Sequence, residues 1–208
     1  MTILFHTPKG GVGKSLLAIL TSEFFRWAGY RVALMDASGN PTAGRFIEGC
    51  SVHGRDVSAA EDPQVVVIDT KGVSSSAIPF VPEASLIVCP FGPAEDDAIE
   101  TLEWYAGLGA HQYKAVMLVN RLRPIGNTKE QQAVIDHVED QLQSLGGLLL
   151  YGLIDRPSIY PVVTQGLPAN FFEMEIASES YMRAQAESRR LGRQFAQLLD
   201  LDTSREVA

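Results

Sequence analysis

Residues 6–15 read HTPKGGVGKS, in which two lysines lie five positions apart around a glycine cluster. Backbone N–H groups in such a loop can converge on an anion, and the helix that follows presents its positive end to it. The ordinary phosphate-loop pattern, G-x-x-x-x-G-K-[ST], ends on the GKS of residues 13–15 but requires glycine where this chain has Pro8. An additional cation, Lys9, follows that proline. The spacing therefore predicts a phosphate loop of altered pattern.

Each residue type in this loop suits one part of a nucleotide. Lys14 would reach the β- and γ-phosphates, and the Ser15 hydroxyl would hold Mg²⁺. The loop follows a predicted strand and opens a predicted helix, which is the context that the motif requires. The residues whose backbone would lie against the phosphates are Gly10, Gly11, Val12 and Gly13.

Two aspartates would complete such a site. Asp36 ends the run VALMD and Asp69 ends the run VVVID, so each carboxylate follows four apolar residues. Because parallel strands end at one edge of a sheet, both side chains are expected beside the loop. Asp69 is the predicted metal ligand. For either residue, the alternative is an aspartate that only caps a helix.

The elements that must position these residues alternate between strand and helix. Continuous Val/Ile/Leu runs indicate strands buried on both faces of a parallel sheet. Strands are predicted at Ile3–His6, Arg31–Asp36, Gln64–Asp69, Ser85–Pro90, Lys114–Asn120 and Gly147–Ile154. Helices are predicted at 15–27, 93–107, 128–144, 157–164 and 178–199. The alternation favours a doubly wound α/β fold, with a mostly parallel sheet and helices on both faces.

Length and composition set further bounds. A chain of 208 residues suits one domain, expected over 1–200 with a tail at 201–208. The net charge of −8 disfavours nucleic-acid binding unless a local basic patch supplies it. No apolar run approaches the ~20 residues that span a bilayer. These features predict a cytoplasmic protein.

The motifs resemble those of a known family. KGGVGKS with Lys9 is similar to the deviant Walker A signature of the ParA/MinD ATPases, and VALMD and VVVIDT resemble their next two motifs. The resemblance implies ATP and Mg²⁺ as ligands, with Lys9 reaching the partner subunit's phosphates across a nucleotide-sandwich homodimer. It places Asp36 near the γ-phosphate and the attacking water, and Asn120 against the adenine. The early loop resembles the small plasmid-partition subgroup, which lacks an N-terminal helix-turn-helix domain.

The chain also departs from that family. The family reads D-x-D-P-Q after the second strand, whereas this chain reads DASGNP, with Ser38 in place of the second carboxylate. Serine does not act as a base near neutral pH, so slow or partner-dependent hydrolysis is expected. Lys71 follows Asp69 where the family has small residues and prolines. It is either a surface charge or a further contact to phosphate or to an acidic partner.

The predicted last helix carries a candidate basic face. Its arginines are Arg183, Arg189, Arg190 and Arg193, opposite apolar residues that would dock on the body. One interpretation is a solvated surface. Another is a contact to the DNA backbone that dimerisation doubles. A membrane-surface helix is less favoured, because the chain ends in the weakly apolar DLDTSREVA.

Together these features predict a ParA-like ATPase that dimerises on Mg-ATP and binds DNA non-specifically, associating with the nucleoid in that state. A ParB-like centromere-binding protein would stimulate it, so that plasmid or chromosome copies are partitioned. One alternative is an ATPase of the same fold that positions a protein complex in conjugation, polar localisation or a MinD-like role, without binding bulk DNA. A second is a small-molecule ligase of related fold, for which we find no catalytic cluster.

Overall fold

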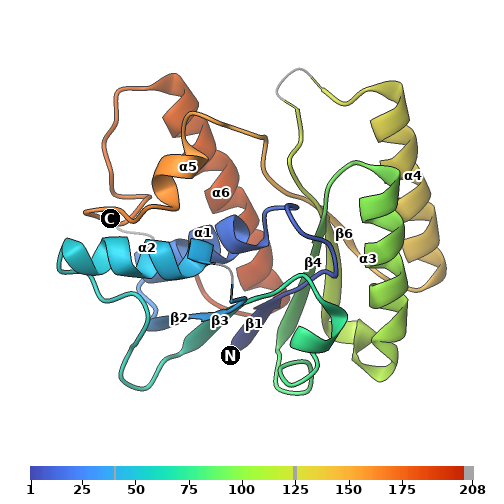
Figure 1. Ribbon diagram of the computed structural model, residues 1–208, viewed down its shortest axis with the longest axis horizontal. Coiled ribbons are helices and arrows are strands. Elements are labelled where there is room, and N and C mark those ends of the chain that lie inside the picture. Colours follow the sequence, from blue (N-terminus) through green and yellow to red (C-terminus); the bar gives the residue numbers. More distant parts are fainter. Residues whose placement is uncertain (40, 124–125, 204–208) are drawn as a thin grey trace.

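The computed structural model describes residues 1–39, 41–123 and 126–203 (Figure 1). Within these residues, strands form one six-stranded sheet in which every pairing is parallel. The strands are β1 (Thr2–Phe5), β2 (Val32–Ala37), β3 (Val65–Thr70), β4 (Leu86–Phe91), β5 (Ala115–Val119) and β6 (Leu149–Tyr151). Their order in the sheet is β2-β3-β1-β4-β5-β6.

This strand order creates a switch point at β1. The chain leaves β1, builds β2 and β3 on one side, and then crosses to build β4, β5 and β6 on the other. In open α/β sheets, ligands bind outside the carboxyl ends of the strands at such a point. The register pairs Phe5 with Asp69, and Asp36 with Asp69. The sheet therefore brings both predicted carboxylates to the edge from which the glycine loop departs.

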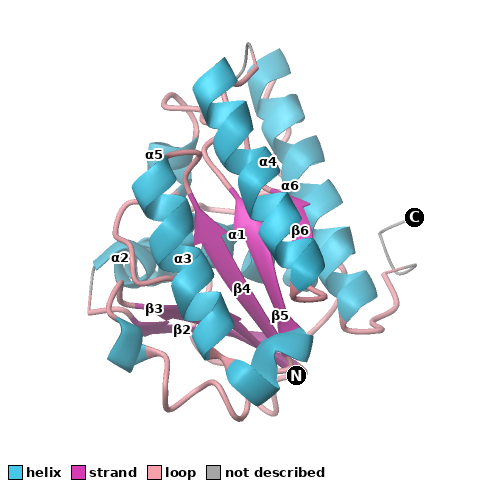
Figure 2. Ribbon diagram, turned by 90° about the vertical axis from the view of Figure 1, so that its right-hand side faces the viewer, coloured by secondary structure: helices cyan, strands magenta, loops and turns pink. Residues whose placement is uncertain are grey.

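Helices cover both faces of this sheet. They are α1 (Lys14–Trp27), α2 (Pro41–Val52), α3 (Glu95–Gly107), α4 (Lys129–Ser144), α5 (Tyr160–Val163) and α6 (Glu179–Leu198), with 3₁₀ turns η1 (Ser74–Ser76) and η2 (Gly109–Lys114). Figure 1 shows α3 and α4 to the right of β4, α5 and α6 to its left, and α1 and α2 above β2 and β3. Figure 2 looks onto the sheet from the side of α3 and α4. The predicted fold class is confirmed.

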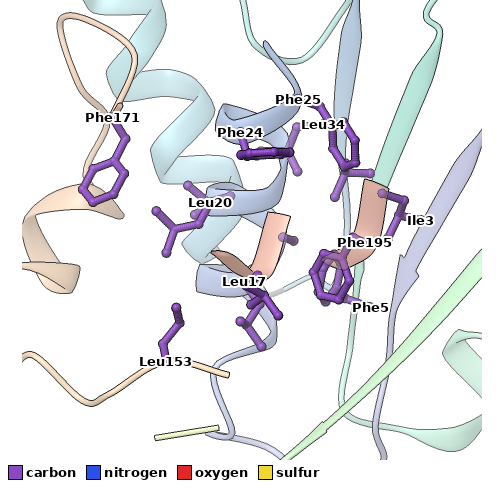
Figure 3. Packing of buried hydrophobic residues seen from close by; sticks show 14 of the residues in the cluster. Ile3, Phe5, Leu17, Leu20, Phe24, Phe25, Leu34, Leu153, Phe171 and Phe195 are labelled. Carbon is purple, nitrogen blue, oxygen red and sulfur yellow. The ribbon is translucent and has the colours of Figure 1, made fainter. Parts of the chain in front are cut away.

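The core is divided by the sheet into two apolar clusters. Successive side chains of a strand point to opposite faces, so Ile3 and Phe5 pack toward α1 and α6 while Leu4 packs toward α3. Figure 3 shows Phe5 against Phe195 of α6, with Leu17 of α1 near them and Phe24 farther along the same helix, beside Phe25. The Phe5 and Phe195 ring centroids lie 6.0 Å apart in an edge-to-face arrangement. This packing anchors the helix that follows the loop.

Helix α2 is absent from the sequence-based assignment. Its sequence, PTAGRFIEGCSV, contains Gly44 and Gly49, and glycine lowers helix propensity. Both glycines serve tertiary packing instead. A Cβ at Gly49 would lie 1.8 Å from the Gln165 carbonyl oxygen, and one at Gly44 would lie 3.2 Å from Asp36 Oδ2. The two glycines are explained by the close approach of neighbouring segments to α2. Helix propensity, which depends on local sequence, does not reveal that approach.

The later elements are shorter than predicted. The run 147–154 contributes β6 over three residues, followed by a single bridge between Leu122 and Ile154. The segment 157–164 contributes only the four-residue α5. At the C-terminal end, Leu201 packs against the core and the Tyr30 hydroxyl donates to the Asp202 carbonyl at 2.6 Å. Residues 204–208 of the predicted tail lie outside the described residues.

Candidate functional site

The glycine loop connects β1 to α1 and has the backbone of an anion cradle. Gly11 and Gly13 have positive φ angles of +80° and +92°, which residues with a side chain rarely adopt. Gly13 is also needed for space, because a Cβ there would lie 2.5 Å from Asn120 Nδ2. At Gly10 a Cβ would meet nothing within 4 Å in the described part of the chain, so the loop opens outward there. The first turn of α1 follows directly, with its N–H groups directed at the loop.

Lys14 lies within this loop and not in solvent. Its side chain is nearly buried, and Nζ donates to the Lys9 carbonyl oxygen at 2.5 Å. Burial lowers the pKa of Lys14, and the nearby Asp69 carboxylate opposes that shift. The Lys14 ammonium therefore has the Lys9 carbonyl oxygen as its present partner. An anion bound in the loop would take the place of that oxygen.

Asp69 is the strongest sign of a cation-binding site. Its side chain is fully buried at the end of β3, and among the described residues neither carboxylate oxygen has a hydrogen-bond partner. The pKa of Asp69 is raised to about 7, mainly by burial and also by the Asp36 carboxylate, while the nearby Ser15 hydroxyl and Lys14 ammonium oppose the shift. An unpartnered buried carboxylate is costly unless a cation binds it. Asp69 and Ser15 together fit the oxygen ligands that Mg²⁺ uses beside a nucleotide.

Asp36 is engaged in a different way. Its Oδ1 accepts from the Ser38 backbone N–H at 2.9 Å and from the Ser38 hydroxyl at 2.5 Å. Its Oδ2 accepts from the Gly44 N–H at 2.8 Å, in the first turn of α2. These contacts are those of the capping alternative. The role of Asp36 beside a γ-phosphate stays a prediction, and Ser38, which bonds Asp36, lines a cavity beside the loop.

Asn120 supports the loop from the end of β5. Its Nδ2 donates to the Val12 carbonyl at 2.9 Å, and its Oδ1 accepts from the Leu153 N–H at 3.0 Å. The side chain is almost completely buried. Asn120 therefore holds the loop against the segment after β6, a role that the sequence did not indicate. Its expected contact with adenine stays a prediction.

Two cavities meet at the loop glycines. One of about 600 Å³ lies over the ends of β2 and β3 and is lined by residues 10, 11 and 13–16 together with Ser38, Gly39, Thr42, Thr70, Lys71 and Gly72. The other, of about 460 Å³, lies over the ends of β5 and β6 and is lined mainly by residues 120–121 and 153–164. Gly11, Gly13 and Leu16 border both. Phosphates and a nucleoside would fit the two cavities side by side.

A third cavity, of about 730 Å³, lies away from this chemistry. It opens between Pro8, the segment of residues 74–82 and α3, and its lining includes Glu100, Glu103 and Trp104. It touches the phosphate loop only at Pro8. Volume alone would favour it as a ligand site, but the residue types that bind phosphate line the other two cavities.

Lys9 points away from the cradle in this structure. Its Nζ lies 3.1 Å from Glu100 Oε1 and 3.8 Å from Asp97 Oδ1, both on α3. The hydrogen bond to Glu100 is the main cause that raises the pKa of Lys9, with further contributions from Asp97 and Asp96. The cation is only partly exposed and is paired within its own chain.

The arginines of α6 lie opposite the buried face, but several have partners. Arg183 is exposed and pairs with Glu179 one turn earlier. Arg190 donates to the carbonyls of Tyr151 and Gly152 at 2.9 and 3.1 Å. The Arg189 guanidinium lies 5.6 Å from the centre of the Trp27 ring, in a cation–π contact. Arg193 is exposed. The helix therefore has a basic face, and some of its arginines make contacts within the chain.

A buried ionic network was not found from the sequence. Glu23 of α1 is fully buried, and its carboxylate accepts two bonds of 2.9 Å from Arg55 and one of 3.0 Å from the Phe171 N–H. Asn170 Nδ2 donates to the Glu23 carbonyl at 2.9 Å. These bonds, with those from Arg55 to the Leu167 and Ala169 carbonyls, hold the segment 167–172 on α1. The sequence signal is a glutamate in a mostly apolar helix.

Comparisons with known proteins agree on the fold. A putative plasmid partition protein from Borrelia burgdorferi B31 bound to AMPPNP matches with a TM-score of 0.67 and 11% identity, over 93% of this chain and 98% of that one. An ATP complex of a McdA variant from Cyanothece gives a TM-score of 0.69 at 11% identity, over 97% and 96%. The cell division ATPase MinD from Pyrococcus furiosus gives 0.67 at 14% identity, over 95% and 98%. No family model matches the chain, and no curated protein matches its sequence.

At these identities the likeness concerns architecture. The matches extend over nearly the whole of each chain, so the overall arrangement of strands and helices is what is shared. No described helix is both long and apolar enough to cross a membrane. The chain therefore has the α/β fold of the plasmid partition protein, McdA and MinD.

Proposed function

We propose that this chain is a ParA/MinD-type ATPase that binds Mg-ATP and dimerises through the bound nucleotide. The observation that carries the proposal is Asp69, a fully buried carboxylate without a partner among the described residues, beside a loop with two positive-φ glycines. One fold can host many functions, so the function has to be inferred from the residues of this site. The site offers a cation ligand and an anion cradle together, which is what a metal–nucleotide complex requires.

Within this proposal each residue has one task. The N–H groups of residues 10–13 bind phosphate oxygens, and Lys14 exchanges the Lys9 carbonyl for phosphate. Ser15 and Asp69 hold Mg²⁺, which neutralises charge on the phosphates when bound. Lys9 leaves Glu100 and contacts the phosphates of the partner subunit. That exchange makes dimerisation depend on the nucleotide.

Hydrolysis is proposed to be slow. Among the described residues that line the 600 Å³ cavity, none is an aspartate or glutamate. In the sequence, Ser38 replaces the second carboxylate of the family pattern. Asp36 is occupied by Ser38 and Gly44. A water there lacks a free carboxylate to take its proton, so a partner protein that reorganises the site would be needed for rapid turnover.

The cellular role we propose is DNA partition. Dimerisation would place two α6 basic faces on one particle, and several phosphate contacts suffice for non-specific, salt-sensitive binding to the nucleoid. A ParB-like partner on the cargo DNA would then stimulate hydrolysis and release. The plasmid partition protein of the same fold supports this role by analogy of architecture.

A second role is favoured by a different observation. The net charge is −8, and Arg183 and Arg190 are already engaged within the chain. A dimer with so little free positive charge would suit an ATPase that positions a protein complex, as in the alternative of conjugation or polar localisation. In that case ATP controls association with a protein and not with bulk DNA.

One experiment tests the function and separates these roles. The oligomeric mass of the purified protein would be measured by light scattering with Mg-AMPPNP, with Mg-ADP and without nucleotide. The wild type should dimerise only with Mg-AMPPNP, and Lys9→Ala and Asp69→Asn should stay monomeric. Retention on random-sequence duplex DNA, measured over a salt series, then decides between partition and positioning. A wild type that stays monomeric with Mg-AMPPNP would exclude the proposed switch.

A further inference from the structure

Three lysines surround the phosphate side of the site, and they differ in their partners. Lys14 donates to the Lys9 carbonyl, and Lys9 pairs with Glu100 on α3. Lys71 lines the 600 Å³ cavity and is exposed. Across residues 1–39, 41–123 and 126–203, its ammonium has no hydrogen bond or ion pair. Lys71 is therefore a cation in the cavity that is available to a ligand.

The backbone around Lys71 is held firmly against the loop. Thr70 is buried, and its hydroxyl donates to the Phe5 carbonyl at 2.8 Å. Gly72 lies so close to the loop that a Cβ would be 3.0 Å from the Lys9 carbonyl oxygen. The Lys71 carbonyl accepts from the Val73 N–H at 2.9 Å and the Ser76 hydroxyl at 2.7 Å. The flexible part of Lys71 is thus its side chain alone.

The two cavities give the direction in which a nucleotide would lie. The 460 Å³ cavity is at the β5 and β6 end and has apolar walls such as Leu153 and Pro157, which suit a nucleoside. The 600 Å³ cavity is at the β2 and β3 end and has glycines, hydroxyls and lysines, which suit phosphates. A phosphate chain that starts from the first cavity and crosses Gly11 and Gly13 ends near Lys71.

We infer that Lys71 is a third phosphate-binding cation, which contacts the terminal phosphate of ATP from within the same chain. The inference deepens the proposed function and rests on it. ADP lacks the phosphate that Lys71 would reach, so the contact distinguishes ATP from ADP before any partner subunit arrives. With no carboxylate in the described cavity lining to oppose it, the added positive charge favours retention of ATP.

The test is the affinity of Mg-AMPPNP and of Mg-ADP for four proteins, measured by titration calorimetry. They are the wild type, Lys71→Ala, Lys71→Arg, and Lys129→Ala as a control that removes an exposed lysine at the start of α4. Lys71→Ala should lower the affinity for Mg-AMPPNP by about tenfold to a hundredfold, which is the effect expected from the loss of one charged hydrogen bond. Its ADP affinity should change less than threefold. Lys71→Arg should restore most of the AMPPNP affinity, and Lys129→Ala should bind like the wild type.

The same titrations in a Lys9→Ala background separate Lys71 from dimerisation. If Lys71 acts within one chain, the selective loss of AMPPNP affinity persists when the lysine proposed to act across the dimer is gone. Equal losses for AMPPNP and ADP, or no loss at all, would overturn the inference while leaving nucleotide binding intact. A wild type that binds neither nucleotide would overturn both the inference and the proposed function.

Discussion

The Lys9 ammonium lies 3.1 Å from the Glu100 carboxylate of its own chain, although its proposed target is a phosphate in another subunit. Asp97, one turn earlier on α3, lies 3.8 Å from the same nitrogen. The two acids therefore compete with the nucleotide for Lys9, and the competition has to be resolved before a dimer forms.

Removing that competition should favour the dimer. We predict that Glu100→Gln lowers the AMPPNP concentration at half-maximal dimerisation by about twofold to fivefold, a modest effect because partly exposed ion pairs are weak. Light scattering over a nucleotide titration measures it, and added salt should reduce the difference. Glu103→Gln, on the same helix and without an ion pair to Lys9 among the described residues, is the matched control. Equal midpoints for Glu100→Gln and the wild type would show that this ion pair does not restrain Lys9.

The buried carboxylate of Asp69 should destabilise the protein when no cation is bound. Its pKa is raised to about 7, so the folded state holds a proton that the unfolded chain has lost. The contribution of Asp69 to the unfolding free energy is fully present below the pKa of the carboxyl in the unfolded chain. It is lost as the pH rises through about 7. Asp69→Asn should therefore raise the melting temperature at pH 8 in EDTA. The corresponding gain in unfolding free energy should be at most about 4 kcal/mol.

The same Asp69→Asn variant should lose its response to Mg²⁺ and nucleotide. Mg-AMPPNP should raise the melting temperature of the wild type and leave that of the variant almost unchanged. Thermal unfolding with and without Mg-AMPPNP gives both results from one set of samples. A variant less stable than the wild type at pH 8 in EDTA would contradict the account of Asp69 as an uncompensated buried charge.

Gly13 is predicted to tolerate no side chain. Alanine there combines a φ of +92° with a Cβ 2.5 Å from Asn120 Nδ2, so Gly13→Ala should destabilise the fold by about 1–3 kcal/mol. Denaturant unfolding measures the loss. Gly10→Ala is the control, because its Cβ meets nothing within 4 Å in the described residues. Adding Asn120→Ala to Gly13→Ala should recover only the part of the lost unfolding free energy that comes from the steric clash. If the losses of the two single variants simply add in the double variant, the clash is refuted.

His6 should make the fold sensitive to acid. It is fully buried at the end of β1, its Nδ1 lies 2.7 Å from Thr70 Oγ1, and its ring centroid lies 4.5 Å from that of Trp104. Burial, together with a smaller contribution from the Lys14 ammonium, lowers the pKa of His6 to about 3. Stability from neutral His6 is therefore present above about 6.5 and is lost as pH falls toward 3.

Replacing His6 by asparagine should remove this part of the acid sensitivity. His6→Asn keeps a polar partner for Thr70 and cannot gain a charge. Between pH 7 and 5 the wild type should lose about 1–2 kcal/mol more unfolding free energy than the variant, by urea denaturation at each pH. Parallel pH profiles for the two proteins would show that His6 is not the group responsible.

Local sequence alone determined the class of fold and the centre of the site. Continuous apolar runs in the strands and the GKS motif are short-range signals, because strand burial and loop chemistry depend on adjacent residues. The positions of Lys14, Ser15 and Asp69 followed from those signals, and the structure places all three together. Helix α2 did not follow, since its glycines are explained by contacts with Gln165 and Asp36 and not by their neighbours in sequence.

The partners of charged and amide groups were decided only by the tertiary structure. The sequence places Lys9 in a phosphate loop, but α3, some ninety residues later, supplies its present partner. Asn120 and Asp36 carry the expected residue types, yet the fold commits the first to bracing the loop and the second to the start of α2. Glu23 is buried only because Arg55 and the Phe171 N–H meet it there. A hydrogen bond depends on distances of about 3 Å between residues far apart in the chain, and no local pattern encodes such a distance.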